Sequence, residues 1–237
     1  MEKYVVVDIE TTGAHPVDSE IIEIGAVCIE DGKVIGTFNE LVKPINKIPE
    51  YITGITNITD EMVQDAKGIQ DVLPRFIEFC DNSMLIGHNI ILFDYRLLKI
   101  KASQIGYKFE KKGIDTLVIS RKMLANLPSR KLGDLCTYYG ISLENAHRAY
   151  HDAFATYELF ENLRRDFIGI EPELFKARDM VFSVPKKEPM TIKQKKYLES
   201  LCKNHKLDLP SNYDKLTKSE CSKQIDAIIL KYGRVIR

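Results

Sequence analysis

The stretch that decides the fold lies at the start of the chain, where residues 4–13 read YVVVDIETTG and residues 21–29 read IIEIGAVCI. Both are short, mostly β-branched apolar runs, which are typical of buried strands. The Asp31-Gly32 pair then indicates a hairpin, and the alternating pattern from Val34 to Val42 favours a return strand. We therefore expect the fold to begin with three antiparallel strands.

Helical and strand patterns alternate after this hairpin. Apolar residues from Ile69 to Cys80 repeat with the spacing of a helix packed on a sheet. The next apolar run, Met84–Gly87, predicts a short strand, and a helical stretch follows it through Leu97 and Leu98. We expect the last strand over Ile114–Val118 and another amphipathic helix over Ala153–Phe167. This order predicts an α/β fold with a mixed sheet, antiparallel and then parallel, flanked by helices. Ligands of such sheets bind at the carboxyl ends of strands.

The periodic pattern weakens after Ile168 and returns near the end of the chain. Residues 184–190, VPKKEPM, are typical of a linker, and two short helical patterns follow it. We therefore predict a domain over residues 1–168, a linker over 169–189 and a basic helical module over 190–237.

The net charge of the whole chain is zero, but it is unevenly distributed. Residues 186–237 carry 13 Lys and Arg against six Asp and Glu, a net charge of +7, so the preceding part carries −7. An acidic body suits metal binding and a basic tail suits nucleic-acid contact. A solvated lysine-rich surface is an equally good interpretation of the tail.

The remaining composition favours a cytoplasmic protein. The five cysteines are scattered without a C-x-x-C pair, which argues against structural zinc and against a disulfide framework. No apolar stretch approaches the length of about 20 residues that a membrane span needs, and the N-terminus lacks the pattern of a signal peptide. We expect no membrane partner.

Two acids, Asp8 and Glu10, stand at the end of the first strand and project from the same face. Beside apolar neighbours they are costly to desolvate without a positive partner, and carboxylates are preferred ligands of Mg²⁺. From this pair alone, two solvated acids at a strand end are equally well supported. Thr11, Thr12 and Gly13 follow, and they fit either an ordinary turn or a close backbone approach to a ligand.

Two later segments carry further candidate residues. In GHNIILFD, residues 87–94, Asp94 falls where the following helix begins, and taken alone it is more simply a helix-start acid. In HRAYHDA, residues 147–153, His147 lies five residues before Asp152 and can accept a proton near neutral pH. His151 suggests a zinc pair with His147, but no H-E-x-x-H context supports one, so we interpret it as a surface or supporting residue.

Taken together, the three segments give the order D-x-E, then D, then H-x(4)-D. This order resembles that of the DEDDh 3′→5′ exonucleases, the superfamily of polymerase proofreading subunits, RNase T and oligoribonuclease. The resemblance implies a ribonuclease H-like fold. VDIETTG with IIEIGAV, GHNIILFD and HRAYHDA match the three motifs of that family, and the resemblance covers roughly residues 3–165. Two positions depart from the common pattern: one more residue separates His88-Asn89 from Asp94, and Thr53 stands where many relatives carry His.

The resemblance implies a site and a reaction. Asp8, Glu10, Asp94 and Asp152 would bind two divalent metal ions, Mg²⁺ or Mn²⁺, and His147 would be the general base in the release of nucleoside 5′-monophosphates from a 3′ end. The expected contacts of the terminal nucleotide are Thr11, Thr12, Gly13, Ile55, His88, Asn89 and Phe93. Phe93 is equally well interpreted as a core residue. A His-Asn pair such as His88-Asn89 more often makes hydrogen bonds at the end of a strand than takes part in catalysis.

Three functions stay open at this point. The chain is expected to degrade single-stranded or frayed nucleic acid with a free 3′ end, with DNA favoured. It would act either as a stand-alone exonuclease or as a proofreading or repair accessory whose partner is a polymerase or repair complex. The alternatives are an exoribonuclease that trims 3′ ends and a catalytically silent nucleic-acid-binding scaffold. No 2′-OH reader is recognisable in the sequence.

Overall fold

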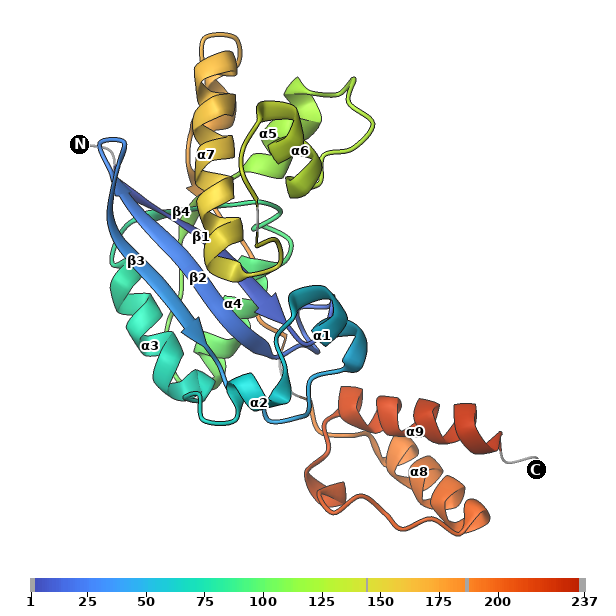
Figure 1. Cartoon of the computed structure of the whole chain (residues 1–237). Helices are drawn as coiled ribbons and strands as arrows, with labels where there is room; N and C mark the ends of the chain where they lie inside the picture. The colour runs from blue at the N-terminus through green and yellow to red at the C-terminus, as the bar shows by residue number, and fades with distance from the viewer. Residues whose placement is uncertain (1–2, 144, 186–187, 235–237) are drawn as a thin grey trace. The chain divides into compact units, whose positions relative to one another are not determined.

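The computed structural model describes residues 3–143, 145–185 and 188–234. Its centre is a mixed sheet (Figure 1). The described residues form six strands in the order β3-β2-β1-β4-β5-β6. The strands are β1 (Lys3–Thr11), β2 (Ile21–Glu30), β3 (Lys33–Leu41), β4 (Met84–Gly87), β5 (Lys112–Asp115) and β6 (Arg178–Asp179). The first three are antiparallel, and β4 and β5 add parallel strands beside β1, so the predicted fold class is confirmed.

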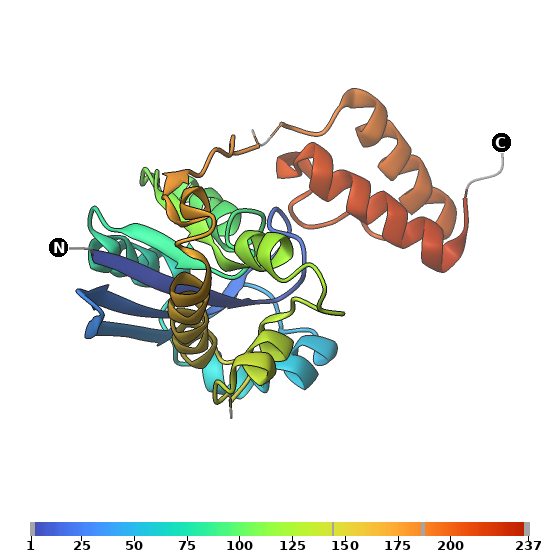
Figure 2. The ribbon, with the colours of Figure 1, turned by 90° about the horizontal axis from the view of Figure 1, so that it is seen from above.

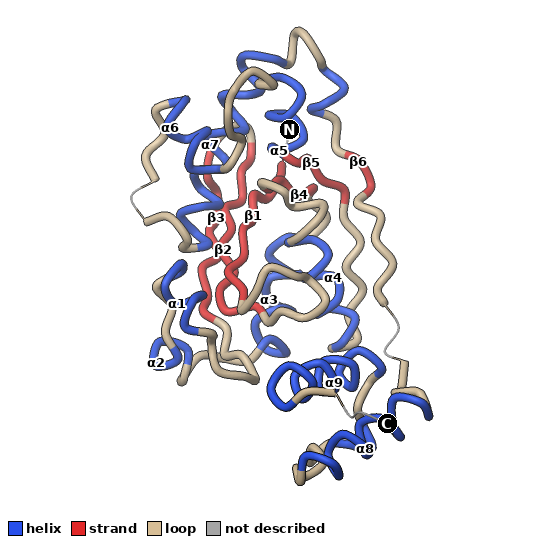
Figure 3. The backbone as a smooth tube through the Cα atoms, turned by 90° about the vertical axis from the view of Figure 1, so that its right-hand side faces the viewer, coloured by secondary structure: helices blue, strands red, loops and turns tan. Residues whose placement is uncertain are grey.

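Helices cover both faces of this sheet (Figure 1 and Figure 2). Val5, Val7 and Ile9 pack on one face with α3 (Ile69–Cys80) and α4 (Asp94–Gln104). Tyr4 and Val6 point to the other face because side chains alternate along a strand, and there they join α7 in a second core. The remaining helices of this part are α1 (Glu50–Thr56), α2 (Asp60–Val63), α5 (Thr116–Met123), α6 (Leu132–Tyr139) and α7 (Ala149–Phe167). β1 lies between β2 and β4, at the centre of the sheet (Figure 3).

Two predicted elements differ from the observed ones. The prediction of a strand over Ile114–Val118 is wrong beyond Asp115, because the Asp115 side chain accepts the Leu117 backbone N–H and starts α5. A β-branched run therefore continues as a helix once an acid caps it. The last helix of the domain begins at Ala149, before the predicted Ala153, so Asp152 lies in its first turn.

The predicted linker is partly ordered against the domain. Within residues 169–189, η1 (Pro172–Phe175) is a short 3₁₀-helix, and β6 pairs antiparallel with β5. Met180 is buried in the same core as Val5 and α3. The first compact unit accordingly runs to Val184, and a second one covers residues 185–237.

The second unit is a pair of helices, α8 (Ile192–His205) and α9 (Lys218–Tyr232), joined through a short 3₁₀-helix, η2 (Tyr213–Lys215). Its own small core contains Leu198, Leu201 and Cys221. Met1, Glu2, Glu144, Lys186, Lys187 and residues 235–237, which the predicted domains include, lie outside the described residues. None of the helices in the described ranges combines the length and apolar character that crossing a membrane requires.

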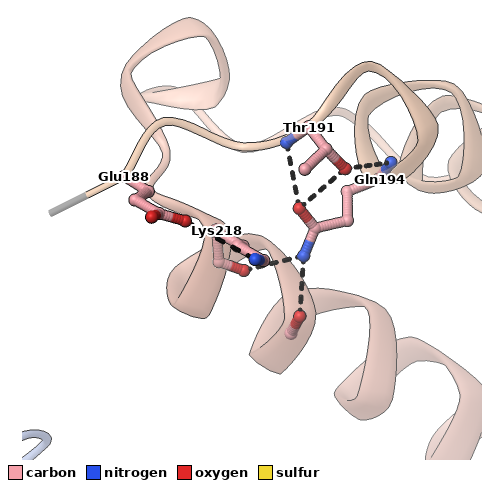
Figure 4. Close-up of polar contacts among 5 residues, drawn as sticks. Glu188, Thr191, Gln194 and Lys218 are labelled. Carbon is pink, nitrogen blue, oxygen red and sulfur yellow. Dashed lines mark hydrogen bonds and ion pairs between the residues drawn. The ribbon is translucent and has the colours of Figure 1, made fainter.

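Gln194 ties the starts of the two helices together (Figure 4). Its Oε1 accepts the Thr191 backbone N–H at 3.0 Å, closing a capping box on α8. Its Nε2 donates to the Lys218 carbonyl at 2.9 Å and to Ser222 Oγ at 2.8 Å, both on α9. The Lys218 ammonium also pairs with Glu188 at 3.5 Å. One side chain thereby fixes how the two helices of this unit meet.

Candidate active site

Two acidic side chains lie where β1 ends. Tyr4 and Val6 pack toward α7, and Asp8 and Glu10 continue that face of the strand. Both acids are partly buried. Because β1 is flanked by β2 and β4, its carboxyl end opens in the middle of the sheet rather than at an edge strand.

Asp94 reaches the same place from the neighbouring strand. β4 is parallel to β1, so the two strands end on the same side of the sheet. Asp94 is the first residue of α4, the helix that follows β4, and only 5% of it is exposed. The backbone N–H of Ile9, which lies between the two acids of β1, is near enough to this carboxylate to lower its pKa in part.

Asp152 and His147 come from the start of α7. Asp152 is 7% exposed, and its Oδ2 accepts the His147 backbone N–H at 2.9 Å. His147 has φ +63°, a left-handed conformation that costs a non-glycine residue about 1–2 kcal/mol. Its ring is exposed. One ligand atom each from Glu10, His147 and Asp152 lie within 4.8 Å of one another.

Burial raises the pKa of all four carboxyl groups, and repulsion from neighbouring carboxylates adds to this effect. Burial, followed by the charges of Asp94 and Asp152, raises the pKa of Asp8 well above its usual value. Burial and the charge of Asp152 raise the pKa of Glu10 to about 8. Burial also raises the pKa of Asp94 to about 7 and that of Asp152 to about 6. These four groups can be ionised together at neutral pH only if positive charge lies among them.

The donor set fits hard divalent cations. Asp8, Glu10, Asp94 and Asp152 offer only carboxylate oxygens, the ligands that Mg²⁺ and Mn²⁺ prefer. Binding a cation would offset the repulsion that now raises their pKa values. The structure therefore brings together the five residues that the sequence singled out for catalysis.

Glu23, which the sequence analysis missed, anchors the start of α7. It lies on β2 opposite Glu10 and is 1% exposed. Its carboxylate receives the Arg148 guanidinium, with 2.7 Å to Nη2, and accepts the Ala149 backbone N–H at 2.9 Å. The signal in the sequence was one acid inside an apolar strand, IIEIG, and it does not reveal the distant partner.

Asp115 is a second missed residue. It is 5% exposed at the end of β5, next to β4 in the sheet. Its Oδ1 accepts the Asn89 N–H at 2.9 Å and its Oδ2 accepts the Ile91 N–H at 3.2 Å. Asp115 therefore fixes the turn that carries the chain from β4 to Asp94.

The residues expected to line the terminal nucleotide lie in two places. Thr11 and Thr12 stabilise their own turn, through Thr11 Oγ1 to the Gly13 carbonyl and through Thr12 Oγ1, which accepts the Glu20 N–H. Ile55, on α1, is 48% exposed. Tyr51, an exposed aromatic residue of α1 that the sequence analysis missed, places its hydroxyl 3.8 Å from where a Cβ on Gly13 would lie.

The other three expected contacts differ in how free their side chains are. His88 is engaged at both ring nitrogens, at 2.9 Å to Thr116 Oγ1 and at 2.9 Å to the Arg130 carbonyl, and burial lowers its pKa. Asn89 adopts φ +67° in the turn after β4. Phe93 packs, partly buried, against the core of α3 and α4. The His88 side chain thus links the end of β4 to Thr116 and to the Arg130 carbonyl.

Comparison with known proteins gives consistent matches. The model of a family described as exonuclease, the RNase T family, matches residues 5–160. The PolC-type DNA polymerase III of Caldanaerobacter subterraneus is 42% identical over 158 residues, which is 67% of this chain and 11% of that protein. That of Clostridium perfringens is 41% identical over 160 residues, 68% of this chain and 11% of that protein. The chain thus spans about a tenth of the length of these relatives.

Solved structures show the same fold. Escherichia coli exonuclease I in complex with a dT13 oligonucleotide has a TM-score of 0.64 at 20% identity, covering 74% of this chain and 43% of that one. Exonuclease X in complex with 5′ overhanging duplex DNA has a TM-score of 0.57 at 24% identity, covering 70% of this chain and 93% of that one. At these identities the likeness concerns the fold. The resemblance stated from the motifs is confirmed.

Proposed function

Because this chain belongs to the exonuclease family, we propose that it is a metal-dependent 3′→5′ exonuclease that releases nucleoside 5′-monophosphates. The observation that carries this proposal is the convergence of four carboxyl groups with raised pKa values and one exposed histidine at the end of β1. They come from β1, α4, α7 and the loop before α7. A silent scaffold has no need of so costly an arrangement.

In the proposed mechanism, Asp8, Glu10, Asp94 and Asp152 would hold two divalent cations. These ions would neutralise the phosphodiester and stabilise the charge that develops during an in-line displacement. His147 takes the proton from the attacking water, since its exposed ring lies beside Glu10 and Asp152. The His147 backbone bond to Asp152 keeps that ring at the start of α7.

The terminal nucleotide is proposed to bind over the turn formed by Thr11, Thr12 and Gly13. Tyr51 and Ile55 lie one helical turn apart on α1, and both are exposed, at 63% and 48%. An aromatic ring and an aliphatic side chain on one helix face suit the stacking of bases from a single strand. Phe93 faces the core more than the site, and we assign it no stacking role.

DNA is the favoured substrate, as single strands or frayed ends. The PolC-type relatives are DNA polymerases by name, and the two solved neighbours are named as complexes with DNA. A proofreading or repair role beside a polymerase would follow from the PolC likeness. The cytoplasm is the proposed compartment, since all five cysteines are buried and free, as in proteins of reducing compartments.

We propose that the basic helical module, residues 190–237, binds the phosphates of the substrate strand through one face of α8. Lys193, Lys196 and Lys203 recur on the side of α8 opposite the buried Leu198 and Leu201, and all three lysines are exposed. Tyr197, 39% exposed, adds an aromatic ring. In the described part of the chain no ion pair engages these lysines, in contrast to Lys195, which pairs with Asp214 at 3.1 Å.

The decisive experiment for the main proposal is incubation of the protein with 5′-labelled single-stranded DNA, single-stranded RNA and mismatched duplex in Mg²⁺ or Mn²⁺. A ladder that shortens from the 3′ end is the expected result, with DNA degraded faster than RNA. Internal cuts, or intact strands in every metal while Asp8→Ala behaves as the wild type, would overturn the proposal.

A further inference from the structure

A cavity of about 710 Å³ lies at the carboxyl end of β4, the strand next to β1 in the sheet. Its wall includes His88 and Asn89, the residues that end β4 and lead toward Asp94. The opposite wall is one side of α5, where Arg121 lies in the last turn, and the segment that leads into α6, with Arg130 and Lys131. The wall thus combines three cationic side chains with no Asp or Glu.

The three cationic side chains differ in whether they already have hydrogen-bond or ion-pair partners. Arg130 donates to the backbone carbonyls of its own loop, at Leu127 and, at 3.4 Å, at Ala125. Its side chain therefore shapes the wall. Arg121 and Lys131 are exposed, and no ion pair among the residues that the structure describes neutralises either. Asp134, an acid on α6 that does not line the cavity, accepts the hydroxyl of Ser129, which does.

The cavity is fixed to the carboxylate cluster by two hydrogen bonds. His88 Nε2 donates to the Arg130 carbonyl at 2.9 Å, since a carbonyl can only accept, and this bond joins the end of β4 to the cationic wall. Asn89 N–H is held by Asp115 at 2.9 Å, in the turn that positions Asp94. These bonds therefore hold the backbone at Arg130 next to the end of β4, from which the chain leads to Asp94.

From this arrangement we propose that the cavity binds a backbone phosphate of the strand being degraded, upstream of the scissile bond, through Arg121 and Lys131. The inference deepens the proposed function and rests on it. An anionic strand must approach a cluster of carboxylates, and a cationic wall next to that cluster lowers the electrostatic barrier to its approach. Asn89 also lines the cavity, and a side-chain amide is a neutral donor for phosphate oxygens.

The test compares two substrates that differ in length, so that only the longer one can contact the cavity. The p-nitrophenyl ester of thymidine 5′-monophosphate offers one phosphate to the carboxylate cluster, and a single-stranded DNA 20-mer also reaches the cavity. Arg121→Ala/Lys131→Ala should weaken binding of the 20-mer, measured by fluorescence anisotropy without divalent metal, by about tenfold. The slope of log affinity against log salt should fall by about 1.4, or about 0.7 for each lost contact with a single strand. Turnover of the 20-mer should fall more than turnover of the ester.

The matched control is Lys33→Ala/Lys112→Ala. It removes the same charge from two exposed residues that begin β3 and β5, at the end of the sheet opposite the acids, and should bind the 20-mer as the wild type does. Equal affinity of wild type and Arg121→Ala/Lys131→Ala for the 20-mer would overturn the inference, and ester turnover by the wild type would still uphold the exonuclease. Equal losses on both substrates would also overturn it. A wild type that cleaves neither substrate in Mg²⁺ or Mn²⁺ would instead refute the proposed function.

One further measurement distinguishes binding of a phosphate in the strand from binding of a free anion. Titration of the wild type with inorganic phosphate should give no saturable binding that depends on Arg121 and Lys131. Saturable phosphate binding that the double variant loses, without a loss of affinity for the 20-mer, would assign the cavity to a free anion and overturn the strand assignment.

Discussion

Glu23 on β2 and Arg148 before α7 form an ion pair with 2.7 Å between Oε1 and Nη2, although 125 residues separate them in sequence. The carboxylate is 1% exposed and the guanidinium is 34% exposed. The pair holds the start of α7 against the sheet next to Glu10. It therefore positions His147 and Asp152 without itself belonging to the proposed ligand set.

Arg148→Ala should destabilise the protein by about 3 kcal/mol, because it leaves the Glu23 carboxylate buried without its cation. The free energy of unfolding in urea measures this effect. The control is Lys176→Ala, which breaks a pair with Glu173 that is exposed on both sides, at 65% and 60%, and should cost less than about 1 kcal/mol. If the two variants lose equal stability, the anchoring role is refuted.

The structure explains why some residues of the candidate site could be predicted from the sequence and others could not. Asp8, Glu10, Asp94 and Asp152 stand at the ends of strands or starts of helices, which leave local patterns of apolar periodicity, so their convergence was predictable. Glu23 and Asp115 act through backbone N–H groups 126 and 26 residues away. Such partners leave no local pattern. The prediction that the last strand extends to Val118 was wrong because a β-branched residue favours a strand unless an upstream residue caps a helix there.

Metal-free protein should lose stability as the pH rises from about 4.5 to about 8. Burial raises the folded-state pKa of Glu10 to about 8 and that of Asp94 to about 7, above their values in an unfolded chain. The folded protein therefore binds more protons than the unfolded one across this range, and its stability falls as these protons are lost. Melting temperatures measured in chelator from pH 4.5 to pH 8 test this, with unfolding followed by circular dichroism.

Asp8→Asn provides the matching variant. In chelator at pH 8 it should melt at a higher temperature than the wild type, since one charge leaves the carboxylate cluster. Addition of Mg²⁺ or Mn²⁺ should raise the melting temperature of the wild type and have little effect on the variant. A wild type whose melting temperature is independent of both pH and metal would contradict the interpretation of the carboxylate cluster as a cation site.

His147→Asn should lower kcat by about 10²–10⁴-fold, the usual contribution of a positioned general base. Asn is the suitable replacement because it tolerates the left-handed backbone at φ +63°. The thermal shift caused by Mg²⁺ should persist, since the four carboxylates are untouched. His151→Asn is the control: this exposed neighbour on the first turn of α7 should retain wild-type turnover. Equal losses in both variants would argue against His147 as the base.

The lysine face of α8 predicts a defined change in salt dependence. Lys193→Ala/Lys196→Ala/Lys203→Ala should lower the slope of log affinity against log salt for single-stranded DNA by about 2, or about 0.7 for each contact. The control removes three other cations of the same unit, Lys215, Lys231 and Arg234, and should change the slope less. Identical slopes for the two triple variants would show that only the total charge matters, which contradicts a specific binding face.

Gly25 on β2 sets how closely α7 approaches the sheet. A Cβ added there would lie 2.0 Å from the Tyr150 nitrogen and 2.1 Å from the Ala149 carbonyl carbon, both in the first turn of α7. Backbone cannot yield as a flexible side chain does, so Gly25→Ala must push α7 away. We expect it to lose about 3 kcal/mol of stability, as overpacked cores do.

The same shift should lower activity more than stability alone explains. Asp152 lies two residues beyond Tyr150, and a displacement of about 1 Å in a reacting group can cost about 100-fold in rate. kcat should therefore fall by about that factor at temperatures where circular dichroism shows the variant folded. Gly133→Ala is the matched control, since it lies within α6 with nothing within 4 Å of the added Cβ. It should stabilise the protein by about 0.4–1 kcal/mol and leave kcat unchanged. A folded Gly25→Ala with full kcat would show that the start of α7 tolerates displacement and that the position of Asp152 is less critical than its proposed role as a metal ligand requires.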